Sequence, residues 1–560
     1  MIRAKPRVRS RALAETLASP SGSLLSLLGR PALLAGTRLA PLSLRPKAVA
    51  LIAYLALEGR ELRRRDVARL LFPETEEPLA VLRWHLSHVR SSAPSFIARH
   101  LRATREDVAL QIPTDVALFR RNAQVICRRP GASGAARALA LYRDDLVAGL
   151  TVSATADFDN WLYVAQESLR RDFRLATLAF GRWALDHRTL RQAVEPLARL
   201  VTVDPYCEDG QVLLIQVYEA LGETARAAAA YDRYQRIVRH ELAAEPRPAL
   251  VLRFEGRTSA RSALPQEDFV PLKDVTLHIV DWAGGEPAIL AIHGSAGMAH
   301  NFGPLAERLA PGFRLLGVDL RGHGFSDKPP SGYDLRRHIE DICQLIPALN
   351  LRRPVLLGHS AGGTVAAFIA AEADVAGLVL LEAMIGDRAF TENAAAQAAP
   401  LATGLGRPVA GFDAYLSEWR ARRGRYSDDA ERLADRWVRF ALAPLPSGVY
   451  RERALRTAVE AEWTSIIEGD SLGALARVKC PVMIVQAVKP WLGGRPYFTP
   501  RIVEAQLRAA PHARLFIAQH SDHGTLVRDP EHGMIEALVE FFIGCARDRT
   551  STRSDQLTPR

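Results

Sequence analysis

The residues best suited to chemistry lie in a short stretch around Ser360. An apolar run over 355–357 ends at a glycine, and small residues with helical spacing follow the serine. The pattern Gly-His-Ser-Ala-Gly over 358–362 predicts a sharp turn from a strand into a helix, with the serine at its apex. A serine hydroxyl becomes nucleophilic once a base removes its proton. We therefore expect Ser360 to attack acyl carbonyl carbons, and the alternative is an ordinary strand-to-helix turn.

The elements around this turn indicate an alternating α/β domain. Residues 275–282 alternate as a strand and 288–292 form a buried strand. Further motifs follow: His-Gly at 293–294, Asp-Leu-Arg-Gly-His-Gly-Phe-Ser-Asp at 319–327, and Ser-Asp-His-Gly at 521–524. In this order, and with the turn at Ser360, they resemble the α/β-hydrolase family. The resemblance covers 267–545 and implies an α/β-hydrolase fold.

The resemblance implies a triad in the chain order serine, acid, histidine. His523 lies in the loop where the family carries its general base, and His520 is a weaker candidate because no glycine follows it. The alternative is a loop histidine without a role. Backbone N–H groups must stabilise the oxyanion of the reaction. The resemblance implies the amide of Ala361, which follows the nucleophile, and the amide of Ser295, which follows the His-Gly motif.

The acid is where the sequence departs from the family. The usual position lies in the loop 487–500, which contains no Asp or Glu. Glu382, which ends the predicted strand 377–381, is the better candidate and keeps the chain order of the triad. Asp387 and the lack of any functional acid remain alternatives. Asp522 would have to fold back onto the histidine that follows it.

Residues 386–475 interrupt this domain between two predicted strands and are rich in helix-forming residues. They include Trp419 and Trp463 and are interpreted as a helical cap over the active site. Many alanines and leucines predict a mainly apolar pocket, although these residues could simply pack the cap. A serine nucleophile indicates hydrolysis of a small apolar ester, lactone, thioester or amide. No metal and no organic cofactor is implied.

Basic residues are concentrated at the front of the chain. Residues 1–120 hold 20 Lys and Arg against 10 Asp and Glu, a surplus of 10, while the whole chain has a net charge of +11. This asymmetry predicts a polyanionic partner for the front end alone. The alternative is an arginine-rich surface that is only hydrated.

The front end also has the elements of a DNA-binding domain over 24–120. Three helices, near 45–58, 64–72 and 77–91, precede a predicted hairpin over 100–113, the order of a winged helix-turn-helix. The phrases at 45–56 and 82–90 resemble the DNA-binding domain of antibiotic regulatory proteins (SARP-type activators). That resemblance implies DNA contacts from Arg83, His85, Ser87, His88 and Arg90, and phosphate contacts from the wing residues Arg102 and Arg105. The alternative is an amphipathic helix with a hydrated polar face.

Helical repeats are predicted over 130–250. Residues 192–199 and 226–233 are in register at a separation of 34, which is typical of tetratricopeptide repeats. The segments at 138–146 and 158–161 resemble the bacterial transcriptional activation domain that follows the winged helix in SARP-type proteins. The resemblance implies contacts with proteins, with RNA polymerase and a second copy of the chain as partners. A linker is expected over 251–266.

Composition restricts the remaining classes. The chain has 560 residues, 48% hydrophobic, without an apolar run long enough to cross a membrane. Its five cysteines are scattered, which favours a reducing compartment and argues against structural zinc. We expect a cytoplasmic protein with disordered tails at 1–23 and 546–560.

These patterns predict a multidomain protein: an α+β winged helix, an all-α tetratricopeptide-like domain and an α/β hydrolase with a cap. We interpret it as a one-component transcription regulator that binds DNA and hydrolyses a small acyl ligand. Two alternatives remain open. The chain could be an esterase with scaffold domains, or a regulator whose hydrolase domain is a catalytically dead ligand sensor.

Overall fold

We analysed a computed structural model, which describes residues 22–35, 38–255, 264–423, 431, 436, 439–445, 448–491, 494 and 496–554. The expected tail at 1–23 lies almost entirely outside these residues. The chain divides into two compact units, and each is described by itself. The first consists mainly of the chain up to Val238, and the second of most of the chain from Arg239 onward.

The first unit begins with an antiparallel sheet, β1 (Ser23–Ser26), β2 (Ala32–Ala35) and β3 (Arg38–Pro41). Then follow α1 (Pro46–Glu58), β4 (Leu62–Arg63), α2 (Arg64–Leu71), α3 (Pro78–Ser92), α4 (Ser95–His100), β5 (Leu101–Ala103) and β6 (Asp107–Leu110). Strands β4, β6 and β5 form a second antiparallel sheet. Leu82, Leu86 and Val89 bury one face of α3, as their helical spacing predicts.

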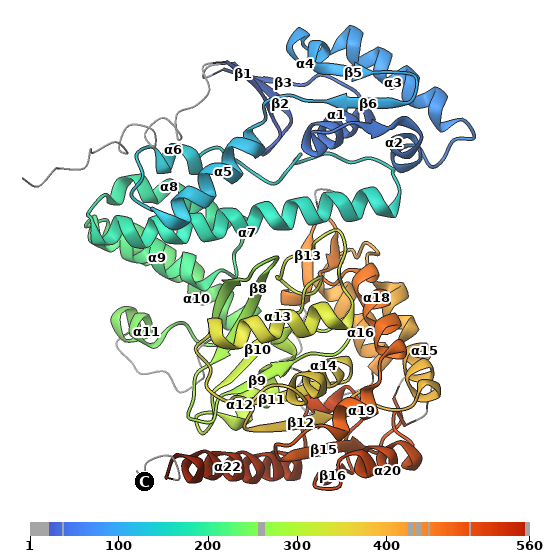
Figure 1. The fold of residues 1–560 in the computed structure, drawn as a ribbon. Helices are drawn as coiled ribbons and strands as arrows, with labels where there is room; N and C mark the ends of the chain where they lie inside the picture. The colour runs from blue at the N-terminus through green and yellow to red at the C-terminus, as the bar shows by residue number, and fades with distance from the viewer. Residues whose placement is uncertain are drawn as a thin grey trace, which may run out of the picture. The chain divides into compact units, whose positions relative to one another are not determined.

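A helical array completes the first unit (Figure 1). It comprises α5 (Asp115–Arg128), α6 (Ala135–Leu139), α7 (Ala156–Asp186), α8 (Leu190–Val203), α9 (Glu208–Ala220) and α10 (Thr224–Arg236). Helix α7 packs on α5 and α8, and each helix from α8 to α10 packs on the next. The buried carboxylate of Asp115 accepts hydrogen bonds from the Leu27 amide and the Ser26 hydroxyl, at 2.8 and 2.6 Å. These bonds join the helical array to the end of β1.

A short π-helical turn (Ile237–Glu241) and α11 (Pro248–Glu255) follow the array. The expected linker over 251–266 is therefore helical at its start, because the run from Pro248 buries Leu250 and Val251 and contains no glycine before residue 256. Residues 256–263 lie outside the described residues. The first strand of the second unit then begins at Gln266.

An eight-stranded mixed sheet organises the second unit, in the order β16-β15-β12-β11-β9-β10-β8-β7. The strands are β7 (Gln266–Pro271), β8 (Thr276–Trp282), β9 (Ile289–Ile292), β10 (Leu315–Val318), β11 (Val355–His359), β12 (Gly377–Leu381), β15 (Val482–Ala487) and β16 (Arg514–Ala518). The strands from β10 to β16 are parallel, and β8 is antiparallel to both neighbours. The near-continuous apolar sequences of β9, β11 and β12 follow from burial on both faces.

Helices cover both faces of this sheet (Figure 1). One core includes residues of α13 (Leu335–Ala348), α14 (Ala361–Ala370), α19 (Ser471–Ala476) and α20 (Pro500–Ala509). The other includes residues of α12 (Gly303–Leu309), α21 (Thr525–Arg528) and α22 (His532–Ser554). Helix α22 continues to Ser554, so 546–554 of the expected disordered tail is helical, because no glycine or proline interrupts the helix there; 555–560 lie outside the described residues.

The segment between β12 and β15 forms the cap. It contains α15 (Arg388–Gly404), α16 (Phe412–Arg423), the antiparallel pair β13 (Leu442–Pro444) and β14 (Tyr450–Glu452), and α18 (Arg456–Glu468). The sequence predicted the helices of this segment but not the strand pair. Side chains of α15 and α18 enter the same buried core as α14, which fixes them above the nucleophile turn.

Candidate functional site

Ser360 sits at the junction of β11 and α14 with φ +53° and ψ −123°. A non-glycine residue with positive φ is strained, and such strain concentrates at functional sites. A Cβ at residue 358 would lie 2.4 Å from the Cα of Gly363, and one at residue 362 would lie 2.3 Å from two backbone oxygens. The two glycines of the motif are therefore required by close backbone approach, which supports the predicted sharp turn.

The structure brings Ser360, His523 and Glu382 to one place at the carboxyl ends of the strands. His523 Nδ1 lies 2.9 Å from Glu382 Oε2, and the amide of Ala487 donates to Glu382 Oε1 at 3.0 Å. Glu382 follows β12 directly and has φ +40°, a second strained residue in the site. The ring N–H of His359 donates to the backbone oxygen of His523 at 2.8 Å and holds the histidine loop against the nucleophile turn.

The other acids considered from the sequence have different partners. Asp387 caps α15, where its carboxylate accepts from the Phe390 amide at 2.9 Å, and it also pairs with Arg501. Asp522 accepts the amides of Gly524 and Thr525 at 2.8 and 2.9 Å, so its carboxylate shapes the loop that holds His523. Of these carboxylates, Glu382 is the one bonded to the histidine.

Burial controls the electrostatics of the pair. His523 is 3% exposed, and burial lowers the pKa of its imidazole, which keeps the ring neutral and able to accept a proton. Burial also raises the pKa of Glu382, and the Ala487 N–H opposes that effect. With its proton on Nδ1 and directed at Glu382, the imidazole presents the Nε2 lone pair as the base.

Two backbone amides close to Ser360 are candidates for an oxyanion hole. Ala361 begins α14, so its N–H belongs to the free amides of a helix N-terminus. The loop after β9 passes so close to the nucleophile that a Cβ on Gly294 would lie 2.8 Å from the Ser360 Cβ. That approach brings the neighbouring Ser295 close to Ser360, and both residues line the same pocket.

A buried carboxyl group from α18 holds the loop that contains Ser295. The Ser295 hydroxyl donates to Glu462 Oε1 at 2.5 Å, and the indole N–H of Trp463 donates to the same hydroxyl at 2.7 Å. Glu462 is fully buried, and burial raises its pKa to about 7. Sequence reasoning did not single out Glu462. The available signal was its place on the buried face of α18, four residues from Ala458 and from Ile466.

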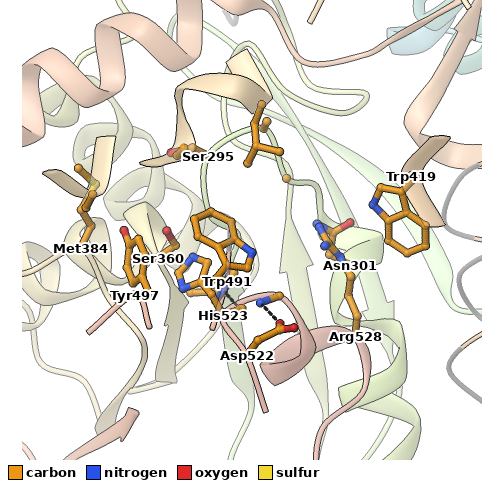
Figure 2. Close-up of a pocket in the computed structure, with 18 of the residues that line it drawn as sticks. Ser295, Asn301, Ser360, Met384, Trp419, Trp491, Tyr497, Asp522, His523 and Arg528 are labelled. Carbon is orange, nitrogen blue, oxygen red and sulfur yellow. Dashed lines mark hydrogen bonds between the residues drawn. The ribbon is translucent and has the colours of Figure 1, made fainter. Parts of the chain in front are cut away.

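The nucleophile opens into a pocket of about 410 Å³ (Figure 2). Met384 and Tyr497 lie on one side of Ser360, and Asn301, Trp419 and Arg528 lie on the other. The expectation of a mainly apolar pocket thus holds for one side only. Residues far apart in the sequence supply the polar side, so no local pattern could reveal it.

Tyr497 is a pocket residue that the sequence analysis missed. Its side chain is 4% exposed, and the ring centroid lies 3.9 Å from that of His523. Figure 2 shows its hydroxyl beside that of Ser360. Tyr497 lies in the loop 487–500, which has no Asp or Glu. The sequence feature that could have marked it is an aromatic residue in a segment otherwise typical of a loop.

The residues predicted to contact DNA divide into exposed and buried sets. The exposed set consists of Arg83, Ser87, Arg90, Arg102 and Arg105. The side chain of His88 is partly exposed. His85 is corrected: it is 7% exposed, stacks on Phe72 with centroids 4.9 Å apart, and burial lowers its pKa to about 4. The helical period places residue 85 beside Leu82 and Leu86 on the packed face.

An exposed aromatic residue on the same helix was missed. Trp84 is 48% exposed, stacks on His88 with centroids 5.3 Å apart, and carries the Arg45 guanidinium 5.0 Å from its ring centroid. The Arg45 guanidinium is thus within cation–π range of this exposed ring. The signal in the sequence was its position next to Arg83, off the apolar face.

Comparison with protein families matches two parts of the chain. The bacterial transcriptional activator domain matches residues 114–255, and the alpha/beta hydrolase family matches residues 289–537. The first match begins at α5, so it extends further toward the N-terminus than the helical domain predicted over 130–250. No helix among the described residues could span a bilayer, and no cluster of three or more metal-ligating side chains occurs among them.

Curated relatives match shorter stretches. A 2-(acetamidomethylene)succinate hydrolase of Mesorhizobium japonicum is 39% identical over 93 residues, 17% of this chain and 33% of that protein. The AB hydrolase superfamily protein YisY of Bacillus subtilis is 39% identical over 116 residues, 20% of this chain and 42% of that protein. The chain thus spans less than half the length of these relatives.

Among solved structures, an E-2-(acetamidomethylene)succinate hydrolase is 24% identical with a TM-score of 0.43, covering 50% of this chain and 98% of the other. The thioesterase domain from the curacin biosynthetic pathway is 19% identical with a TM-score of 0.40, covering 50% and 100%. The family matches and the mixed sheet lead to one conclusion. The chain joins a bacterial transcriptional activator domain, residues 114–255, to an alpha/beta hydrolase domain, residues 289–537.

Proposed function

We propose that this protein is a one-component transcription regulator whose hydrolase domain cleaves a small acyl compound with Ser360, His523 and Glu382. One observation carries the catalytic part of the proposal: the hydrogen bond of 2.9 Å between His523 and Glu382, beside a strained serine. A buried carboxylate on Nδ1 leaves Nε2 to act as the base, which is the arrangement that activates a serine.

The reaction follows from these positions. Nε2 of His523 takes the proton of Ser360 as its Oγ attacks the acyl carbon, and the amides of Ala361 and Ser295 bind the oxyanion. The imidazolium then protonates the leaving group, which departs and leaves an acyl-enzyme on Oγ. Water attacks that ester with His523 again as the base, and the carboxylic acid leaves as Oγ regains its proton.

The pocket defines the substrate class. A volume of about 410 Å³ admits a small molecule, and the apolar side beside Met384 suits a short acyl or aromatic group. The polar side, with Asn301 and Arg528, suits a substituent that accepts hydrogen bonds. An ester or an amide is favoured. The curated relative named as a 2-(acetamidomethylene)succinate hydrolase, which the chain covers by one third, supports hydrolysis as the reaction class.

DNA binding is proposed for the first unit as a winged helix. The succession α1, α2, α3 and the pair β5–β6 supports that assignment, as do the exposed arginines Arg83, Arg90, Arg102 and Arg105. The helical array supports a tetratricopeptide-like module, because the two sequence repeats fall in α8 and α10. By family resemblance, RNA polymerase and a second copy of the chain are its proposed partners, and the cytoplasm its proposed compartment.

The two activities would be thermodynamically coupled. If an acyl ligand changes the affinity for DNA, then DNA must change the affinity for that ligand by the same factor. An inert ester analogue that saturates the pocket should therefore shift the dissociation constant for a selected DNA site. An unchanged dissociation constant at saturation would remove the regulatory part of the proposal and leave the enzyme.

Fluorophosphonate labelling of the full chain tests the catalytic part, with Ser360→Ala as control. We expect rapid labelling that Ser360→Ala abolishes. Selection from random DNA tests the other part, with Arg83→Ala weakening binding and Arg191→Ala, an 83% exposed arginine of α8, as the matched control. Labelling without DNA selection would indicate an esterase with scaffold domains. Selection without labelling would indicate a ligand sensor.

A further inference from the structure

The loop that lacks an acid brings a different group to the site. Tyr497 lies between β15 and α20, with its ring against Trp491 at 5.5 Å and nearly perpendicular to it. Phe390 of the cap contacts it edge-on, with centroids 6.0 Å apart. A ring packed on two aromatic side chains and 4% exposed has little freedom to move its hydroxyl.

That hydroxyl lies next to the candidate nucleophile. Figure 2 shows the Tyr497 oxygen beside the Ser360 oxygen, and both residues line the same pocket. The ring also lies on His523, with centroids 3.9 Å apart. Burial raises the pKa of Tyr497 above that of an ordinary phenol, and the neighbouring Ser360 side chain opposes that effect, so the phenol keeps its proton at neutral pH. A phenylalanine would pack equally well, but it would leave Oγ without this partner.

We propose that Tyr497 is a catalytic residue that hydrogen-bonds Oγ of Ser360 while negative charge develops on that oxygen. The proposal rests on the proposed serine hydrolase function. Charge develops on Oγ twice: when the hydroxyl loses its proton to attack, and when Oγ leaves the acyl carbon after water has attacked. A phenol in contact with Oγ stabilises both transition states.

Proton transfer remains with His523. In deacylation the bond from water oxygen to the acyl carbon forms, the bond from Oγ to that carbon breaks, and the proton from water reaches Oγ through Nε2. Tyr497 donates a hydrogen bond and retains its own proton throughout. Hydrogen bonds to a charged atom are about twice as strong as those between neutral groups. The bond from Tyr497 to Oγ should therefore stabilise the two transition states more than it stabilises the free enzyme.

Tyr497→Phe tests this in the full-length protein. The matched control is Tyr333→Phe. Tyr333 is 5% exposed and lies outside the pocket, its hydroxyl donates to the Pro329 carbonyl oxygen, and burial also raises its pKa. With p-nitrophenyl acetate, the initial burst reports acylation and the steady state reports deacylation. We expect Tyr497→Phe to slow both by about 10- to 100-fold with KM changed less than about threefold. Tyr333→Phe should leave both rates unchanged.

The outcomes separate this proposal from the one on which it depends. Wild-type protein that neither labels with a fluorophosphonate nor gives a burst would overturn both. Wild-type labelling with equal or faster rates in Tyr497→Phe would overturn the role of Tyr497 alone. If Tyr497→Phe lowers the melting temperature, Tyr497→3-fluorotyrosine keeps the shape and strengthens the donor, so both rates should match or exceed wild type. A loss with this variant would also overturn the role.

Discussion

Glu382→Gln tests the triad at its most unusual member. The substitution keeps the size of the side chain and an oxygen for the Ala487 amide, but its NH2 group would face His523 Nδ1 in place of a carboxylate oxygen. Since an NH2 group donates, Nδ1 must then accept, and the ring proton moves to Nε2. The base that faces Ser360 is lost, while the packing around residue 382 is retained.

The magnitude follows from the distance. Two unit charges 2.9 Å apart, the separation of the two bonded atoms, attract by roughly 6 kcal/mol at an effective dielectric constant of about 20. At 1.36 kcal/mol per factor of ten, this is about 10⁴ in rate, the loss measured when the acid of a serine protease triad is made an amide. We therefore expect kcat to fall by about 10⁴-fold with KM nearly unchanged.

The assay is hydrolysis of p-nitrophenyl butyrate, with fluorophosphonate labelling as a second readout that needs no turnover. Asp387→Asn is the control, because Asp387 caps α15 and pairs with Arg501 rather than with the histidine. It should retain activity within about threefold. The reasoning is refuted if Glu382→Gln keeps more than a tenth of the wild-type kcat, or if Asp522→Asn loses as much as Glu382→Gln does.

Three further predictions concern the same domain. Burial lowers the pKa of His523 but raises that of Glu382 to about 8, so kcat/KM should fall as the pH drops through about 8 and Glu382 takes up a proton; a level kcat/KM from pH 8 to pH 6 would contradict this. Glu462→Ala removes the acceptor of the Ser295 hydroxyl and should lower kcat about tenfold. Glu462→Gln keeps an oxygen that can accept this bond, so its kcat should stay within about threefold of wild type. Equal losses of kcat in the two variants would refute a positioning role for Glu462. Gly362→Ala should destabilise the domain by about 1–3 kcal/mol in denaturant unfolding, while Gly411→Ala, whose Cβ meets nothing within 4 Å, should not.

The sequence predicted those parts of the molecule that local patterns encode. The strand, turn and helix around Ser360 are such a pattern. Gly358 is required because the backbone of Gly363 lies against it, and Gly362 is required because backbone oxygens at the end of the neighbouring strand β9 lie against it. Elimination made Glu382 the better candidate for the acid, because the loop after β15 has no carboxylate and Glu382 directly follows a strand; Asp387 stayed open until the hydrogen bonds of both carboxylates were known. His85 was assigned wrongly because its residue type suggested a DNA contact, while its position on the helix placed it in the core.

What the sequence could not show depends on side chains brought together over long separations. Glu462 reaches Ser295 across 167 positions, and no local pattern marks such a contact. The polar side of the pocket has the same origin. Glutamate and arginine are common residue types. Only the folded sheet and cap determine that Glu462 contacts Ser295 and that Arg528 lines the pocket.

The displaced acid and Tyr497 are two consequences of one arrangement. β12 and β15 are adjacent and parallel, so residues at their carboxyl ends can both reach His523. With Glu382 after β12 bonded to the histidine, a second carboxylate in the loop after β15 would repel it and raise the cost of burial. The loop after β15 has no carboxylate, and its aromatic residues Trp491 and Tyr497 pack on the imidazole. Moving the acid back, as Glu382→Gln combined with Tyr497→Asp, should consequently fail to restore the rate, because the ring packing that orients His523 is lost with the tyrosine.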